Sequence, residues 1–495
     1  MKEKVVIIGA GIAGFTCGIN LLQKGYDVTI IEKNKDVGGL CFGYFVNGHY
    51  IDACFHWLMG TNRKSSLYKE WKNIGAFDKT TKFISLPTLG TFEYEGTKVT
   101  LYRNLDKTEK ELVKISPNDK KIIHKFIESS RHMGSIMGLV LKNIDFSVKE
   151  IVNALPKSGH LLRSMRQTRE DYSKNFEHPA LQFMAKNAQT GYNNMFFFFD
   201  FYGLFSTGNA DVPVGGAYYM VERIKNKFLS LGGELMLNTE VTKLLVRKGI
   251  VTGARTEKGI IHGEHFVSTV DPIYTNNKLL GKKYSLPFFN YLARTVHKRS
   301  ISSCFNVYLA VDADMSKLDV PTVFNIKPTK IGSRTITSLL VRSYHFDPAF
   351  IKDGKTTVSL FVDQNEDDYE YFASLDEAEY KKVTKSMANS LIDIFLEKYP
   401  EYKGKVELLS YFTPIELKKR TNTSFGSIQS YSFTNRGMMY IQSGKHRKVD
   451  NLHLCGQWIR AIGGTPTALL TALDVVKDFE KKSRKNKGSR RYIEF

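Results

Sequence analysis

The stretch VVIIGAGIAGFTCGINLLQKGYDVTIIEKNKDVGGLCFGY, residues 5–44, decides the fold. Its β-branched run at 5–8 and the run DVTIIE at 27–32 predict two buried strands, and the apolar spacing from Ile12 to about Lys24 predicts a helix between them. A strand, a helix and a second strand within about 30 residues form a βαβ unit. The sequence therefore predicts an α/β fold with a Rossmann-like domain.

The turn between the first strand and the helix carries the pattern G-x-G-x-x-G at Gly9, Gly11 and Gly14. The first glycine permits a tight turn, the second lets the backbone approach a pyrophosphate, and the third lets the helix pack closely on the strand. The first helical residues, Ile12 and Ala13, would present free N–H groups and a partial positive charge to the phosphates. The pattern predicts dinucleotide binding.

An acidic residue at the end of the second strand supports this interpretation. Glu32 lies 18 positions after Gly14 (32 − 14), and Lys33 follows it. A carboxylate at this place accepts hydrogen bonds from ribose hydroxyls and repels a 2′-phosphate. The alternative is a glycine-rich turn with a merely solvated Glu32.

A second glycine pair favours a flavin over a nicotinamide. Gly38 and Gly39 follow the second strand, and Leu40 comes next. An extended flavin dinucleotide would pass close to this loop, where backbone without side chains is needed. We find no second G-x-G-x-x-G unit after a strand, so a diffusing acceptor such as oxygen or a quinone is more natural than an NADPH domain. The sequence does not identify the electron acceptor.

Four stretches carry a resemblance to a known family: GAGIAG…IIEKNKDVGG, HYIDACFHWLMGT (49–61), PVGGAYYMVERIKNKFLSLGGELMLNTEVTKLLV (213–246) and NLHLCGQWIRAIGGTPTALLTALDVV (451–476). In order and spacing they resemble the FAD-dependent superfamily of phytoene desaturases, carotenoid isomerases, retinol saturases and amine oxidases. They are most similar to its phytoene-dehydrogenase-like branch. The resemblance implies FAD as the cofactor and a long apolar isoprenoid or polyene as the substrate.

The resemblance also implies roles for the matching positions. Glu32 and the glycines of the first loop would hold the ADP half, Val241 would meet the adenine, and Gly39 and Leu40 would line the flavin path. The flavin end would be surrounded by Gly456, Gln457, Gly464, Thr465 and Thr467. Amine oxidases and many desaturases carry an arginine where this chain has Leu40, which weakens the amine-oxidase interpretation.

The flavin end has a physical argument of its own. Thr465 and Pro466 predict the N-cap and first residue of a helix that continues to Phe479. The positive end of that helix dipole would then face whatever precedes Thr465, and it would stabilise negative charge on a reduced flavin. The alternative is an ordinary capped helix.

The chain is predicted to contain two domains. The FAD-binding domain would be discontinuous, and the substrate-binding domain would be an inserted α+β unit. Within the latter, SPNDKKIIHKFIESSRHM predicts a helix that Ser116 caps and Pro117 begins. The segments assigned to the FAD-binding domain are 1–62, 211–283 and 424–480, those assigned to the substrate-binding domain are 63–210 and 284–423, and 481–495 is a basic tail.

The aromatic run YNNMFFFFDFYGLF, from Tyr192 to Phe205, could wall an apolar tunnel or pack in the core. His56 follows the flavin loop, titrates near neutral pH when unperturbed, and is the candidate catalytic residue for moving a proton. It could equally only pack beside the cofactor. Cys54 and His56 are candidates for a covalent flavin anchor, and Arg420 and Arg460 for holding an anionic substrate group.

The composition sets further limits. The 495 residues carry a formal net charge of +21, which suits a lysine-rich solvated surface or, as an alternative, contact with an anionic membrane. No nucleic-acid-binding module is recognised, and no run reaches the roughly 18–20 apolar residues that span a bilayer. Five scattered cysteines without a CxxC pair predict no zinc site, no metal and a reducing cytoplasmic compartment.

The leading hypothesis is an FAD-dependent oxidoreductase that inserts, removes or shifts carbon–carbon double bonds in an apolar polyene or isoprenoid such as a carotenoid or retinoid. One alternative is a flavin amine or amino-acid oxidase. Another is a non-catalytic lipid or prenyl carrier of the same fold.

Overall fold

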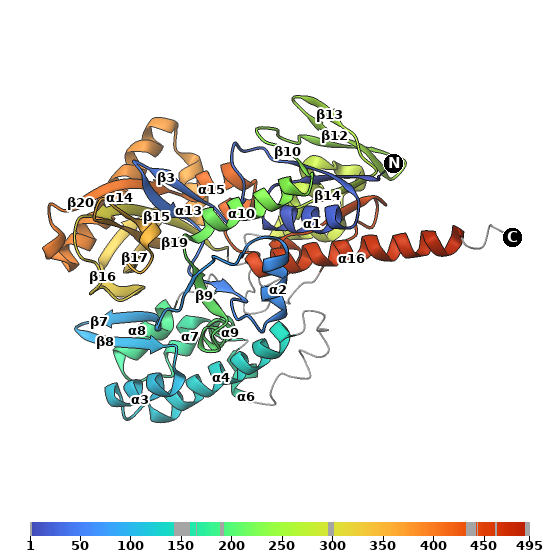
Figure 1. Ribbon diagram of the computed structural model, residues 1–495. Coiled ribbons are helices and arrows are strands. Elements are labelled where there is room, and N and C mark those ends of the chain that lie inside the picture. Colours follow the sequence, from blue (N-terminus) through green and yellow to red (C-terminus); the bar gives the residue numbers. More distant parts are fainter. Residues whose placement is uncertain are drawn as a thin grey trace.

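Two main sheets and a group of helices organise the chain (Figure 1). The structure, a computed structural model, describes residues 2–142, 159–164, 166–188, 193–295, 301–431, 442, 444–460 and 463–490. The first sheet lies at the upper right of Figure 1 and the second at the upper left, with the helices of the middle of the chain below.

The first sheet is parallel throughout, in the order β10-β2-β1-β14-β21. Its strands come from three distant parts of the sequence, and each part lies within one of the three segments predicted to form the FAD-binding domain. Their bounds are β1 Lys4–Ile8, β2 Asp27–Ile31, β10 Glu234–Met236, β14 His265–Ser268 and β21 Leu452–Leu454. The predicted βαβ unit is confirmed.

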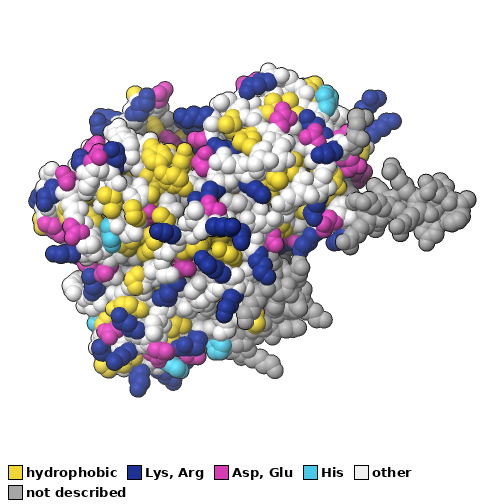
Figure 2. Space-filling view, in the orientation of Figure 1, with side chains coloured by type: hydrophobic (Ala, Val, Ile, Leu, Met, Phe, Trp, Pro, Cys, Tyr) yellow, Lys and Arg dark blue, Asp and Glu magenta, His cyan; other side chains and the backbone are white. Residues whose placement is uncertain are grey.

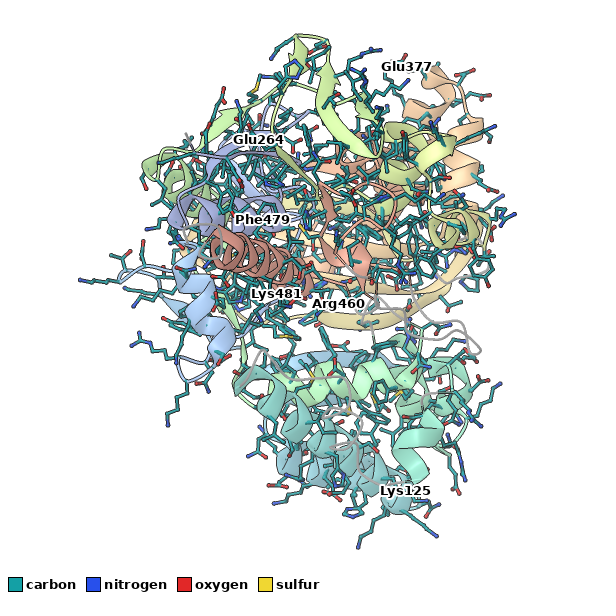
Figure 3. All side chains as sticks on the ribbon, turned by 90° about the vertical axis from the view of Figure 1, so that its right-hand side faces the viewer. Lys125, Glu264, Glu377, Arg460, Phe479 and Lys481 are labelled. Atoms are coloured by element: carbon teal, nitrogen blue, oxygen red, sulfur yellow. The ribbon has the colours of Figure 1, made fainter. Side chains whose placement is uncertain are left out.

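Both faces of this sheet are covered, which explains the unbroken β-branched run of the first strand. Val5 and Ile7 face a core shared with the helices α1 (Ile12–Gln23), α10 (Gly216–Ser230) and α16 (Thr465–Arg490). Val6 and Ile8 face a core shared with an antiparallel sheet of β11 (Lys243–Arg247), β12 (Ile250–Thr256) and β13 (Gly259–Ile261). Figure 3 shows α16, with Phe479 labelled, crossing this part of the molecule.

The second sheet has eight strands and joins the two segments predicted to form the substrate-binding domain. The strand β7 from the first of these segments pairs in parallel with β16 from the second, and the other pairs are antiparallel. The order is β20-β15-β19-β17-β16-β7-β8, with β18 beside β19. The bounds are β7 Thr88–Tyr94, β8 Thr97–Tyr102, β15 Ser303–Val311, β16 Thr322–Ile331, β17 Arg334–Ser343, β18 Ile351–Lys352, β19 Lys355–Gln364 and β20 Val406–Phe412.

Helices flank this sheet on two sides. Apolar side chains of α14 (Glu377–Lys398), including Leu391 and Phe395, share a core with its strands, and α13 (Glu366–Ser374) and α15 (Pro414–Thr421) follow in the same region. Below it in Figure 1, five helices share a core with β7 and β8: α3 Leu105–Ile115, α4 Lys120–Lys142, α7 Arg169–Ser173, α8 Pro179–Asn187 and α9 Met195–Ser206. Two more helices, α2 Ser66–Asn73 and α6 Gly159–Ser164, contact α4, and Leu67 and Trp71 of α2 belong to the core of the first sheet.

Short elements connect these parts. The hairpin of β3 (Gly43–Val46) and β4 (His49–Asp52) follows the second glycine pair, and β9 (Ala210–Pro213) pairs with β5 (Leu58–Met59) and β6 (Phe83–Ile84). The remaining helices are α11 Pro272–Tyr274, α12 Pro287–Thr295, η1 Thr275–Leu279, η2 Lys282–Tyr284, η4 Pro348–Phe350, η5 Pro400–Tyr402, η6 Ser424–Gly426 and η7 Gln457–Ile459.

Two predicted helix positions are corrected. Ser116 ends α3 as its C-cap instead of starting a helix, and α4 begins only at Lys120. The reason is that the Asp119 carboxylate accepts hydrogen bonds from the backbone N–H groups of Glu177 and His178, at 2.8 and 3.0 Å, and so serves another segment. The last helix is longer than predicted and includes residues 481–490 of the basic tail, while 491–495 lie outside the described residues.

The predicted domain boundaries stay a prediction. Among the described helices, none combines the length and apolar character that a membrane crossing requires. On the face shown in Figure 2, lysine and arginine side chains are spread over the surface with acidic side chains among them.

Candidate functional site

A cavity of about 370 Å³ lies between the two sheets. This volume is within the range of small-molecule sites, about 300–1,000 Å³. All the predicted cofactor residues except Gly14 and Thr467 line this cavity. Those in the lining are Gly9, Gly11, Ile12, Ala13, Glu32, Lys33, Gly39, Leu40, Val241, Gly456, Gln457, Gly464 and Thr465. Residues 56 and 57, α9 and the second sheet also contribute to the lining.

The first glycine loop forms one end of the cavity. Gly9 has φ +104°, and a Cβ at Gly11 would meet only Gly38 and Gly39, at 3.8 and 3.9 Å. Gly14 faces away, since a Cβ there would lie 2.0 Å from the carbonyl oxygen of Gly9. The three glycines thus have the separate uses expected of them: turn, open backbone and close packing.

The second glycine pair is joined to the first loop. The N–H of Gly38 donates to the carbonyl of Ala10 at 2.8 Å, and Gly38 and Gly39 have φ of +106° and +61°. Positive φ values favour glycine. The two loops therefore form one continuous backbone surface at the edge of the cavity.

Arg420, from α15, holds this second loop. Its Nε donates to the carbonyl of Gly39 at 2.7 Å, Nη2 donates to Val37 at 3.2 Å, and Nη1 pairs with Asp36 at 2.8 Å. Its guanidinium also lies over the ring of Phe42, 4.0 Å from the centroid. Three nitrogen atoms of Arg420 are thus used to fix the loop, and its contact with a substrate anion stays a prediction.

We expect Arg420→Met to weaken FAD binding about tenfold, because the loop loses charge-assisted hydrogen bonds to two carbonyls. The dissociation constant is measured by the quenching of FAD fluorescence during titration with apoprotein. Lys419→Met removes an exposed charge from the same helix and should leave the constant unchanged. Equal affinity in wild type and Arg420→Met would contradict the assignment.

Glu32 lies at the same end of the cavity and is buried. Its Oε2 accepts from the N–H of Ala10 at 2.9 Å, and its Oε1 accepts from the backbone N–H and side-chain amide of Asn34, at 2.9 and 2.6 Å. These bonds fix the carboxylate, and Oε2, which accepts one of them, keeps a lone pair for a hydroxyl. The side chain of Lys33 turns to α15, where it donates to Asn422 at 2.8 Å, and burial lowers its pKa.

The C-terminal motif also lines the cavity. The side-chain oxygen of Gln457 accepts from the N–H of Gly464 at 2.6 Å, and Thr471 exchanges hydrogen bonds with the backbone of Gly456. The carbonyl of Gly464 accepts from Ala468 at 3.1 Å, so Gly464 is the N-cap of α16 and the predicted cap at Thr465 is off by one residue. A glycine cap has no side chain to bond the first-turn N–H groups.

The residues present fit FAD. The N-termini of α1 and α16 both border the cavity, and the N-cap of α1, Gly11, makes no side-chain capping bond. Helix N-termini of this kind bind anionic groups. The side-chain oxygen of Asn306 is buried in the lining and has no partner among the described residues, as expected of a wall that meets a polar ligand. The group would extend from Glu32 to Gly464.

The aromatic helix α9 borders the rest of the cavity. Phe197, Asp200 and Phe201 line it, whereas Phe199 and Tyr202 are fully buried in the core. Core packing is thus confirmed for one face of α9, and the other face lines the cavity, where an apolar tunnel stays a prediction. The first residue of the aromatic run, Tyr192, lies outside the described residues. On the other walls are Trp57, Met59, Leu340 and Phe361.

His56 also lines the cavity, next to Arg342. Depth inside the protein and then the charge of Arg342 hold the pKa of His56 well below its usual value, although the ring surface is accessible from the cavity. Its pKa is thus displaced from that of an unperturbed histidine in the direction that favours the neutral ring, and the catalytic role of His56 stays a prediction. A guanidinium can only donate, so Nδ1 accepts from Arg342 and the proton of His56 is on Nε2.

The remaining candidate residues, Arg460 and Cys54, differ in their position relative to the cavity. Arg460 forms an ion pair with Asp474 of α16 and lies outside the cavity lining. Cys54 lies in the lining, and a covalent anchor at this residue stays a prediction. Among the residues that the structure describes, no group of three His, Cys, Asp or Glu side chains is placed to hold a metal ion.

Residues 12–478 match the family model described as flavin containing amine oxidoreductase. The chain belongs to this family. FAD is its cofactor, and the resemblance drawn from the four motifs is confirmed.

One curated relative of this flavin oxidoreductase is a phytoene desaturase (neurosporene-forming) of Rhodobacter capsulatus. It is 26% identical over 56% of this chain and 54% of that protein. A second is the 1-hydroxycarotenoid 3,4-desaturase of a Flavobacterium species, 21% identical over 95% of this chain and 97% of that protein. The match spans only about half the length of the first of these.

Solved structures share the fold. An oxidoreductase from Methanosarcina mazei is similar with a TM-score of 0.61 and 15% identity, over 96% of this chain and 100% of that one. Cyclohexylamine oxidase from Brevibacterium oxydans gives 0.59 and 13%, over 97% and 100%. The predicted Rossmann-like α/β fold is confirmed.

The lining residues that the sequence analysis does not single out include Asp200, Asp271 and Arg342. Asp271 ends the VSTVD run after β14 and ties that segment to Ser424 and Tyr431 through its carboxylate. Its place at the carboxyl end of a strand was a usable signal. Arg342 lies in β17 and Asp200 lies in the aromatic helix α9. Neither residue belongs to a sequence motif that would indicate a place in a binding site.

Proposed function

We propose that this flavoprotein is an oxidoreductase that changes carbon–carbon double bonds of an apolar polyene or isoprenoid, by desaturation, saturation or isomerisation. One observation carries the proposal: the cavity that begins at the FAD-binding loops continues between aromatic and aliphatic side chains of α9 and the second sheet. The curated relatives named as phytoene and carotenoid desaturases support the same substrate class.

Bound FAD supplies two-electron chemistry. The chain supplies binding, orientation and a dry site. Glu32 and the glycine loops hold the ADP half in place, and Gln457 fixes the turn before α16. Phe197, Phe201 and Leu340 present apolar surface along which a hydrocarbon chain is bound and from which water is excluded.

His56 has a narrower role than a proton shuttle. Its Nδ1 accepts from Arg342, so it holds a proton on Nε2 at the cavity wall. Because its pKa lies well below 6.5, owing to burial and the neighbouring guanidinium, the ring donates a hydrogen bond as a neutral group. We infer that it orients ligand or cofactor and does not carry charge.

We expect Glu32→Gln to raise the FAD dissociation constant about 10- to 50-fold, because the amide nitrogen cannot accept from Ala10 or Asn34 and one charge-assisted site is lost. The same fluorescence titration measures the constant. Glu257→Gln, in the exposed turn between β12 and β13, is the matched control. An unchanged constant for Glu32→Gln would place the ADP half elsewhere.

The function is tested by incubating the holoprotein with polyenes in phosphatidylcholine vesicles and analysing the products by chromatography and mass spectrometry. A mass change of two hydrogens, or an isomer of unchanged mass, supports the proposal. Peroxide release with amines and no change in any polyene would instead favour an amine oxidase. A protein that binds polyenes, yet neither reduces nor oxidises its flavin with them, would be a carrier.

We further propose that the protein works in the cytoplasm at the surface of an anionic membrane. The net charge of +21 favours anionic headgroups, and long polyenes reside in bilayers. All five cysteines are free, which suits a reducing compartment. Co-sedimentation with vesicles containing phosphatidylglycerol, and its loss at high salt, tests the contact.

A further inference from the structure

An isolated carboxyl group interrupts the apolar part of the cavity. Asp200 is only 8% exposed, lies between Phe197 and Phe201 on the face of α9 that lines the cavity, and its Oδ1 has no hydrogen-bond partner among the described residues. Leaving a buried polar atom unpaired costs free energy. A site for a pure hydrocarbon would be more stable with leucine at this position.

A second unpaired polar group lines the same cavity. The indole of Trp57 packs against Phe201, the residue after Asp200, with ring centroids 4.5 Å apart. Its Nε1–H is buried and has no acceptor among the residues the structure describes, and Trp57 also lines the cavity. The apolar region therefore contains one hydrogen-bond acceptor, Asp200 Oδ1, and one donor, Trp57 Nε1–H, that no described residue pairs with.

The chemistry of this pair selects its ligand. A hydroxyl group both donates and accepts, so it can satisfy the Asp200 carboxyl and the Trp57 N–H together. A carboxylate would be repelled by an ionised Asp200. An ammonium group could not accept from the indole, and it would share the cavity with the Arg342 guanidinium.

We propose that Asp200 and Trp57 form a hydroxyl-binding subsite, and that the substrate is an otherwise apolar chain that carries an alcohol group. This inference rests on the proposed function and narrows it from polyenes or isoprenoids in general to hydroxylated ones. The subsite fixes which stretch of the chain is presented to the flavin end, because the alcohol anchors the chain at α9.

Binding without turnover tests the proposal. The probes are geranylgeraniol, its methyl ether, the hydrocarbon of the same chain without oxygen, and geranylgeranylamine, each in phosphatidylcholine vesicles. The change in the visible spectrum of the holoprotein flavin reports occupancy of the cavity. We expect the alcohol to bind about 10- to 100-fold more tightly than the hydrocarbon, and the ether, which cannot donate to Asp200, to bind less tightly than the alcohol.

Variants assign the preference to the subsite. Asp200→Leu should remove the preference for the alcohol and leave hydrocarbon binding unchanged or tighter, and Trp57→Phe should remove part of it. Ser206→Ala is the control, because this α9 hydroxyl bonds the carbonyl of Gly203 and lies outside the cavity lining. The intact flavin spectrum of each variant verifies its fold.

The outcomes separate the two proposals. If wild type binds alcohol and hydrocarbon equally, or if Asp200→Leu keeps the preference, the subsite is refuted and the proposed function stands. If the amine binds most tightly, the subsite is a cation site and the hydroxyl assignment is wrong. If none of the chains changes the flavin spectrum, the proposed function itself fails.

Discussion

Gly14→Ala is expected to abolish retention of FAD and to destabilise the protein by about 3 kcal/mol. A methyl group at this position would lie 2.0 Å from the carbonyl oxygen of Gly9 and 3.2 Å from its carbon. Both are backbone atoms of the nucleotide loop, so the clash is relieved only if α1 moves away from β1. That movement displaces the N–H groups on which the pyrophosphate depends.

The measurement combines the flavin content of purified protein with chemical unfolding of the apoprotein. Gly138→Ala is a matched control, since this glycine lies within α4 with nothing within 4 Å of a new Cβ. It should retain FAD and gain about 0.5–1 kcal/mol from better helix propensity. Full flavin content and wild-type stability in Gly14→Ala would show that helix and loop do not pack as described.

Asp200→Asn is expected to stabilise the substrate-free holoprotein at alkaline pH by as much as about 4 kcal/mol and to have little effect near pH 4. Burial alone raises the pKa of Asp200 from 3.8 to about 7. A raised folded-state pKa means that protonation favours the folded protein. This contribution is therefore complete below about pH 4 and is lost as the pH rises through 7.

Unfolding free energies of wild type and Asp200→Asn between pH 4 and 8 measure this effect. Their difference should grow by about 1.4 kcal/mol per pH unit until about pH 7 and then level off. Asp393→Asn, on the exposed face of α14, is the matched control and should leave the pH dependence of unfolding as in wild type. A difference independent of pH would mean that Asp200 is paired in the folded state.

The nucleotide end of the site was predictable because its physics is local. Gly9, Gly11 and Glu32 lie within one βαβ unit, where spacing along the chain fixes spacing in space. The flavin end was recognised from the motif at 451–476, although the helix cap shifted from Thr465 to Gly464, because Gln457 draws the glycine N–H toward itself.

The substrate end was not predictable by the same means. Arg342 and Asp200 meet the cavity only after a second sheet and α9 have been assembled from segments far apart in sequence. The sequence points to His56 but not to its pKa, which is lowered first by burial and then by the charge of Arg342, 286 positions away in the chain. The contacts of Arg420 are non-local in the same way, since its partners at 36–39 lie almost 400 positions earlier.

The interleaved strand order of the first sheet has a consequence for biosynthesis. Residues 5–39 are synthesised before β21 and before Gly456 and Gly464, which complete the pocket. The βαβ unit at 5–39 therefore lacks part of its sheet until the chain around residue 452 has been made. Flavin can therefore bind only after the C-terminal segment has folded onto the first sheet, so bound flavin reports that this segment is in place.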